Sequence, residues 1–490
     1  MAIFATACQK EQMNLSEESS VCDIEVSRLV SFDLVGTKSL DVLENEVLAE
    51  TPEEYIPQVQ ELFKGFLTGA QWQQRTYRFN YNTVNGRNEP AVLTGLVSFV
   101  CDGTGRINRN LRTVSLYHIM FNVNQATTEM QAAMPSLRAL HHTLVVTPLL
   151  QGSGVDAGNN PILVAEPLVK ARQAIDCELA AIEVLDELGC AVKLRTDYYT
   201  ENMGVSNGAA VALATQYLLE TKAESPVVEK IRLRGTFCGA GCYDFSGMIT
   251  KALSMKNMDE YSDAVAAMVP YAAMGTIISA NSVRGLGIYG LKDYFSPECV
   301  MGDFNDGVEY GGQAHLPYSI IEHFLNGDVQ MNYMDYMMLS DAEMALFEEM
   351  AEVTDYSQTE MITLPSVFEN VIDNYSYRKI FNKNLYVNKD LENGELDTEG
   401  NLFKALMKSV SKSDMVSLNW FPASPLRMTH STDDDFLPFD TAYGLYEKLS
   451  NNGNNKNVSF KTLRDLNHGD TATRLLMLNI GILPHPCPVD

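Results

Sequence analysis

A serine between two glycines is the residue of this chain best placed to do chemistry. Residues 204–208 read Gly-Val-Ser-Asn-Gly, which is a Gly-x-Ser-x-Gly pattern. Residues 197–203 before it read as a short strand, and residues 209–220 after it are mostly good helix formers. Glycines at both ends allow a turn so sharp that larger side chains would collide with neighbouring backbone. This context predicts that Ser206 is strained and exposed at the end of a strand, where its hydroxyl can act as a nucleophile.

Two residues further along the chain could activate that hydroxyl. Asp434 lies in a polar turn after an apolar segment that reads as a strand, and His468 follows an alternating strand at 458–463. A histidine can remove the proton of a serine, and an acid can orient the histidine and stabilise its cation. The alternative is an ordinary serine in a glycine-flanked turn, and the flanking elements and the downstream partners favour the nucleophile.

With these residues in this order, the chain resembles the α/β-hydrolase superfamily, on its esterase, lipase and prolyl-oligopeptidase-like side. The acid of that family usually sits in a Gly-x-x-Asp-x-x-Val-Pro turn. Here Ser431 replaces the glycine, Asp434 falls on the acid, and Leu437-Pro438 fall on Val-Pro. The family's histidine is often followed by glycine, as His468 is. The resemblance implies a doubly wound, mostly parallel α/β sheet with an inserted helical cap, and a serine mechanism that needs no metal or organic cofactor.

Four residues compete with these assignments. Asp433 and Asp435 flank the acid and are substitutes for it, although the Leu-Pro register ranks Asp434 first and leaves its neighbours to face solvent or cap the next turn. His430 precedes the acid and is expected to end the strand. Ser153 lies in a Gln-Gly-Ser-Gly segment that lacks the full frame, so we interpret it as a loop residue.

The resemblance also implies an oxyanion hole made of two backbone N–H groups. Asn207, the residue after the serine, would supply one of them. The second would follow the predicted strand at 111–117, where the family usually carries His-Gly and this chain has His118 and then Ile119. A backbone donor does not require glycine, but a tight loop is harder to build without it. The second donor is therefore expected at Ile119 or Met120, and the choice stays open.

Predicted strands alternate with predicted helices along the chain before and after these residues. This alternation indicates a mostly parallel, doubly wound sheet. The further elements that we expect are an N-terminal helical extension at 26–72, a β-hairpin at 76–81 and 91–100, strands at 143–148 and 230–237, and helices at 127–142 and 163–188.

This alternation stops in residues 245–411, which are rich in Met, Tyr and Phe. In the resembling enzymes this gap holds a helical cap over the active site. Met and aromatic side chains suit a pliable apolar pocket wall, although most of them more simply form the core of the cap itself. We therefore expect a polar tail at 1–25, a hydrolase core built from 26–244 and 412–490, and a cap at 245–411.

The composition narrows the class of partner. A formal net charge of −27 over 490 residues argues against nucleic acid or an anionic membrane surface, because phosphates would be repelled. No run of the sequence is apolar over the length that a bilayer requires. The nine cysteines have irregular spacings without a zinc pattern. The expected partner is a small ester or acyl substrate, and the oligomeric state stays open.

The first residues resemble the end of a bacterial lipoprotein signal, in which small residues precede an acylated cysteine. Residues 5–8 read Ala-Thr-Ala-Cys, but seven residues are too few for a charged region and an apolar region. Either the true start lies upstream or the match is chance. The first alternative predicts a lipid anchor at Cys8 and a periplasmic or membrane-anchored protein, and the second predicts a cytoplasmic one.

Three functions remain in order of preference. The first is hydrolysis of carboxylic esters through an acyl-enzyme on Ser206. The second is a serine peptidase that releases short peptides with the same chemistry, although the sequence lacks a recognisable propeller or acidic amine-anchor motif. The third is a non-enzymatic binding protein on the same fold, and its support is the missing glycine at Ile119.

Overall fold

A computed structural model describes most of the chain. The described residues are 27–50, 56–64, 72–118 apart from 104, 106 and 108–110, 136–190 apart from 142, 153, 157–159 and 161–162, 198–221, 231–256, 263–295, 378, and 381–479 apart from 392. Across these residues, no helix combines the length with the apolar character that crossing a bilayer needs.

The described strands form one nine-stranded sheet with the order β1-β2-β3-β5-β4-β6-β7-β8-β9. Neighbouring strands from β1 through β2 and β3 to β5 pair antiparallel, and all pairs from β5 to β9 are parallel. The sheet is therefore mostly parallel, as the sequence predicts. The strands are β1 (Leu29–Ser39), β2 (Gln73–Val84), β3 (Pro90–Cys101), β4 (Thr113–His118), β5 (Leu144–Pro148), β6 (Tyr198–Val205), β7 (Ile231–Gly239), β8 (Leu426–Ser431) and β9 (Val458–Leu463).

Helices pack against both faces of this sheet. Asn202 of β6 donates to the Ala212 carbonyl of helix α5 (Asn207–Thr221), so its side chain points to that helix. The next residue, Met203, points to the opposite face and joins the apolar cluster with Leu475 of α15 (His468–Asn479). The remaining core helices are α1 (Leu40–Glu50), α2 (Ile56–Lys64), α4 (Pro167–Glu187) and α14 (Phe439–Leu449).

The N-terminal segment differs from the prediction. Residues 26–72 are not a helical extension throughout, because 29–39 form β1, which pairs with β2 and sets Phe32 opposite Phe79. A strand is favoured there because it binds the free edge of the β2–β3 hairpin and covers that edge. The hairpin itself is confirmed in unbroken register from Gln73↔Cys101 to Val84↔Pro90.

Two predicted helices have different outcomes. The long helix expected at 163–188 is α4, and Gly189 ends it with a φ of 68°, which suits glycine. Of the helix expected at 127–142, the part before residue 136 lies outside the described residues. The remainder is a 3₁₀ helix at Leu137–His141.

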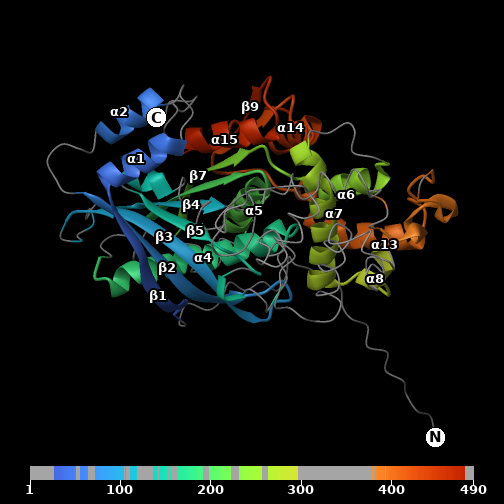
Figure 1. Cartoon of the computed structure of the whole chain (residues 1–490), viewed down its shortest axis with the longest axis horizontal. Coiled ribbons are helices and arrows are strands. Elements are labelled where there is room, and N and C mark those ends of the chain that lie inside the picture. The colour runs from blue at the N-terminus through green and yellow to red at the C-terminus, as the bar shows by residue number, and fades with distance from the viewer. Residues whose placement is uncertain are drawn as a thin grey trace, which may run out of the picture.

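A helical insertion separates β7 from its parallel neighbour β8. Its described helices are α6 (Phe245–Ser254), α7 (Asp263–Arg284), α8 (Leu291–Tyr294) and α13 (Asn401–Val410). Figure 1 shows them grouped beyond one end of the sheet, with α4 and α5 in front of the sheet. Met274, Tyr294 and Phe295 are fully buried among these helices, so part of the Met and aromatic content forms the insertion's own core.

Candidate active site

The turn at Ser206 has the backbone that the Gly-x-Ser-x-Gly pattern predicts. β6 ends at Val205 and α5 begins at Asn207, so one residue joins strand to helix. Its φ of 56° lies in the left-handed region, which costs energy for any residue except glycine. A Cβ atom on Gly204 would lie 2.0 Å from the carbonyl oxygen of Gly208. The first glycine is therefore required because strand and helix approach so closely.

Ser206 is held in this turn from both sides. Its N–H donates to the Gly239 carbonyl at the end of β7 at 2.8 Å, and its own carbonyl accepts from the N–H of Ala209 at 3.0 Å. The residue is only 4% exposed, so the expectation of an exposed serine is wrong. Helix α15 packs against β6 and begins at His468, and this histidine covers the hydroxyl.

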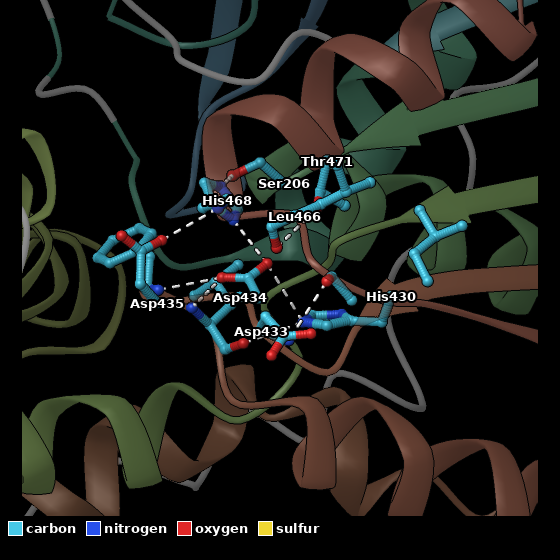
Figure 2. A network of polar contacts seen from close by, with 12 residues as sticks. Ser206, His430, Asp433, Asp434, Asp435, Leu466, His468 and Thr471 are labelled. Carbon is cyan, nitrogen blue, oxygen red and sulfur yellow. Dashed lines mark hydrogen bonds and ion pairs between the residues drawn. The ribbon is translucent and has the colours of Figure 1, made fainter.

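Ser206, His468 and Asp434 form one chain of hydrogen bonds (Figure 2). The Oγ of Ser206 lies 3.0 Å from Nε2 of His468, and Nδ1 of His468 lies 2.9 Å from Oδ2 of Asp434. A carboxylate accepts the proton on Nδ1, which leaves Nε2 free to accept from the serine. The arrangement suits a histidine that acts as a base toward Ser206.

The carboxylate of Asp434 is completely buried. Its Oδ1 accepts from the N–H groups of Phe436 at 3.0 Å and Leu437 at 2.8 Å. Burial by itself raises the pKa of this carboxyl, but the hydrogen bond and charge of His468 and the Leu437 N–H together hold the pKa below its ordinary value. Asp434 is therefore kept ionised beside the imidazole.

The two flanking aspartates bind the loop that carries the histidine, and they do not simply face solvent. Oδ1 of Asp435 accepts from the backbone N–H of His468 at 3.0 Å. Oδ2 of Asp433 accepts from the N–H of Asp465 at 2.8 Å. All three neighbouring aspartates thus hold this loop in place, and Asp434 is the one bonded to the ring (Figure 2).

His430, the rival histidine, lies within β8, four residues before Asp434. Its Nε2 lies 2.9 Å from the Leu437 carbonyl and 3.4 Å from Oδ2 of Asp434. Burial lowers the pKa of His430 and favours the neutral ring, which can donate to that carbonyl. This histidine therefore supports the turn that carries the acid.

Of the proposed oxyanion donors, the structure describes Asn207 and not Ile119 or Met120. Asn207 is the first residue of α5, where helix N–H groups have no intrahelical acceptor and the helix dipole is positive. Ile119, Met120 and the rival Ser153 lie outside the described residues. In the sheet, His118 at the end of β4 pairs with Gly204, so the chain leaves β4 beside the turn at Ser206.

The sequence interpretation missed two side chains around this site. The ring of Phe436 meets the ring of His468 edge to face, with centroids 5.3 Å apart. Lys170 of α4 is buried and bonds to the side chain of Asn207. A signal for Lys170 was available, because it is a cation between the apolar residues Val169 and Ala171 on one helix. Phe436 had no comparable signal.

A cavity of about 180 Å³ lies next to Phe436. Its walls come from the segment between β7 and α6, from α6 and α7, and from the turn after Asp434, and they include Cys242, Met248, Ala272 and Leu437. Phe436 thus borders the cavity and contacts the imidazole of His468. Within the described part of the chain, no group of three or more His, Cys, Asp or Glu side chains is arranged to hold a metal ion.

Comparisons with known proteins support the fold. No protein-family model matches this chain, and no curated protein matches its sequence. Among solved structures, the chain is similar to the rice cell wall degrading esterase LipA from Xanthomonas oryzae, with a TM-score of 0.58 and 15% identity over 92% of this chain and 95% of that one. A protein from Legionella pneumophila is similar with a TM-score of 0.57 and 14% identity, over 92% and 96% of the two chains. The chain has the α/β-hydrolase fold.

Proposed function

We propose that this protein is a serine hydrolase that cleaves carboxylic esters through an acyl-enzyme intermediate. The observation that carries the proposal is the hydrogen-bonded chain from Ser206 through His468 to Asp434, at the sharp turn between β6 and α5. The fold shared with an esterase at low sequence identity is consistent with this chemistry but does not by itself assign it.

The mechanism follows from the atoms in contact. As the Oγ of Ser206 attacks the acyl carbon, its proton passes to Nε2 of His468, while Asp434 stabilises the imidazolium. The oxyanion accepts from the N–H of Asn207 and from a second donor, expected at Ile119 or Met120. His468 then gives the proton to the departing alcohol. Water attacks the acyl-enzyme with His468 as base again, which releases the acid and restores the serine.

The insertion between β7 and β8 is proposed to act as a cap that shapes the acyl site. The cavity beside Phe436 is lined largely by apolar groups of α6 and α7 and lies next to the residue that contacts His468. A volume of 180 Å³ holds about six groups of the size of a water molecule, which suits a short acyl chain. Such a cavity favours an ester over a charged peptide end, although the triad chemistry serves a peptidase equally.

A fluorophosphonate probe and two chromogenic substrates test the proposal. Such a probe reacts covalently with a serine that a histidine activates, and a non-catalytic binding protein on the same fold would stay unlabelled. Labelling should occur in the wild type, disappear in Ser206→Ala and persist in Ser153→Ala. A short-chain nitrophenyl ester should be turned over much faster than a dipeptide amide. Labelling that survives Ser206→Ala would overturn the nucleophile, and faster amide cleavage would favour the peptidase.

We also propose that the chain consists of a tail at 1–25, a hydrolase core and a cap at 245–411. A separate part of the proposal is a lipid anchor at Cys8. Cys8 lies outside the described residues. The wild-type protein should incorporate labelled palmitate, and Cys8→Ala should not. Equal labelling of the two proteins, or no labelling of the wild type, would contradict the anchor.

A further inference from the structure

The side chain of Asn207 is bound at both ends of its amide. Oδ1 accepts from Nζ of Lys170 at 2.6 Å, and Nδ2 donates to the Val164 carbonyl at 2.8 Å. An amide with a donor on its oxygen and an acceptor on its nitrogen has one favoured orientation. Because Asn207 follows Ser206 directly, these two bonds hold the first residue of α5 against the segment that leads into α4.

Lys170 is an unusual residue at its position. It is only 3% exposed, and its neighbours along α4 are buried apolar residues. A buried ammonium loses its hydration, so lysine is rarely found inside a protein unless it has a specific partner. Its described partner is the amide oxygen of Asn207, and the carboxylate of Glu166 one helical turn earlier interacts with its charge. An apolar residue would pack here without that cost, which points to a function for the amine.

The segment 164–166 is held on its other side by the helical insertion. The N–H of Val164 donates to Oγ of Ser279 on α7 at 2.8 Å. The carboxylate of Glu166 forms a two-pronged ion pair with Arg284 at the end of α7 and accepts from Ser413 at 2.9 Å. Glu166 has a φ of 137°, a strained value for a non-glycine residue that persists when its surroundings hold it firmly. A continuous set of polar contacts thus joins α7 to Asn207.

We propose that Lys170 is a positioning residue: through its bond to the Asn207 side chain it orients the Asn207 backbone N–H toward the oxyanion that forms on substrate attached to Ser206. This inference rests on the proposed function and adds a residue to it. The N–H of Asn207 is needed most when negative charge develops on the acyl oxygen. The contribution of Lys170 should therefore affect kcat and leave substrate binding nearly unchanged.

Lys170→Met removes the donor and keeps the length of the side chain. We expect kcat for a short-chain nitrophenyl ester to fall about 10- to 100-fold, which is less than the 10²–10³ typical of losing an oxyanion donor outright, while KM stays within about twofold. Asn207→Ala removes the same contact from the other side and keeps the backbone N–H. It also removes the bond to the Val164 carbonyl, so kcat should fall at least as far. The double variant should be no slower than Asn207→Ala alone, because Lys170 then has no contact with the Asn207 side chain left to lose.

A matched control is Arg28→Met. Arg28 is another buried cation that contacts α4, through Asp176 at 2.9 Å. Its loss should lower the denaturation midpoint but leave kcat, normalised to the sites that a fluorophosphonate titrates, within about twofold of the wild type. This control separates loss of a buried basic side chain from loss of the contact at Asn207.

The outcomes are distinguishable. If Lys170→Met lowers stability but keeps kcat per titrated site, or if its effect and that of Asn207→Ala add in the double variant, the positioning role is wrong while the proposed function stands. If Lys170→Met does not fold, Asn207→Ala alone decides, and wild-type kcat in that variant overturns the role. A wild-type protein that neither reacts with the probe nor hydrolyses the ester would overturn both the proposed function and this inference.

Discussion

The backbone N–H of His468 donates to the side chain of Asp435 at 3.0 Å, while the ring of the same histidine bonds to Asp434. Two neighbouring aspartates thus hold one histidine, the first through its imidazole and the second through its main chain. The position of the ring therefore depends on the whole acidic turn, whereas its tautomer depends on Asp434.

Asp434→Asn should lower ester turnover by about 10⁴ while the fold persists, because the amide no longer holds the imidazole in the right tautomer. Asp433→Asn and Asp435→Asn should stay within about tenfold, since an amide oxygen still accepts the backbone N–H and the lost charge changes the site by only ~1 kcal/mol. Steady-state kinetics with a circular-dichroism check of folding would measure this. A large loss in either flanking variant with little loss in Asp434→Asn would show that the flanking aspartate, and not Asp434, is the acid.

Gly204→Ala should disrupt the turn that carries Ser206. The new Cβ would lie 2.0 Å from the Gly208 carbonyl oxygen, so strand and helix must separate. We expect a loss of about 3 kcal/mol or more in the free energy of unfolding, together with loss of fluorophosphonate labelling. Gly36→Ala in β1 is the control, because nothing lies within 4 Å of its added Cβ. Equal urea midpoints for the two variants would contradict the argument.

Ala272→Leu should narrow the cavity beside Phe436. If this cavity binds the acyl chain, kcat/KM for a hexanoate ester should fall about tenfold or more relative to an acetate ester, because the longer chain loses burial of apolar surface. The rate of labelling by a small fluorophosphonate should change by less than twofold. An unchanged hexanoate-to-acetate ratio would show that this cavity does not bind the acyl chain.

Lys170 should make stability rise with pH. Burial lowers its pKa from the ordinary 10.5 to about 7, against the opposing effects of Glu166 and Cys242. Between these two values the folded protein binds fewer protons than the unfolded chain, so this group adds up to about 1.4 kcal/mol per pH unit to the free energy of unfolding as pH rises. Urea unfolding from pH 7 to pH 9 should therefore show a flatter pH dependence in Lys170→Met. An identical slope in both proteins would contradict the prediction.

Glu178 of α4 should act in the opposite direction. It is fully buried and accepts from Thr200 at 2.5 Å, and burial raises its pKa from the ordinary 4.5 to about 7. The folded protein then binds more protons than the unfolded chain between these values, so its contribution to stability is lost as pH rises through the same interval. Glu178→Gln keeps an acceptor for Thr200 and should flatten the curve between pH 4.5 and pH 7. A steeper fall of the free energy of unfolding in Glu178→Gln over this pH interval would contradict the prediction.

Local patterns in the sequence determined much of the fold and of the candidate site. The spacing of the glycines around Ser206 predicts a sharp turn, and the structure shows that strand and helix approach closely there. Alternating polar and apolar residues predict the β2–β3 hairpin. The order of serine, acid and histidine, and the register from Leu437-Pro438 back to Asp434, are likewise readable along the chain. Apart from the order of the three residues, which spans positions 206 to 468, each of these signals comes from neighbours within about ten residues, so no distant contact is needed to interpret it.

Tertiary structure decided the features that depend on distant segments. Residues 29–39 become a strand because the edge of β2 is available to pair with them. Ser206 is buried because α15 packs on β6 and brings His468 over the hydroxyl, 262 residues away in sequence. The contact of Lys170 with Asn207 arises because α4 and the start of α5 lie side by side, and a buried lysine in the sequence of a helix does not identify its partner. Such contacts depend on packing and desolvation in the folded protein, which local sequence patterns do not contain.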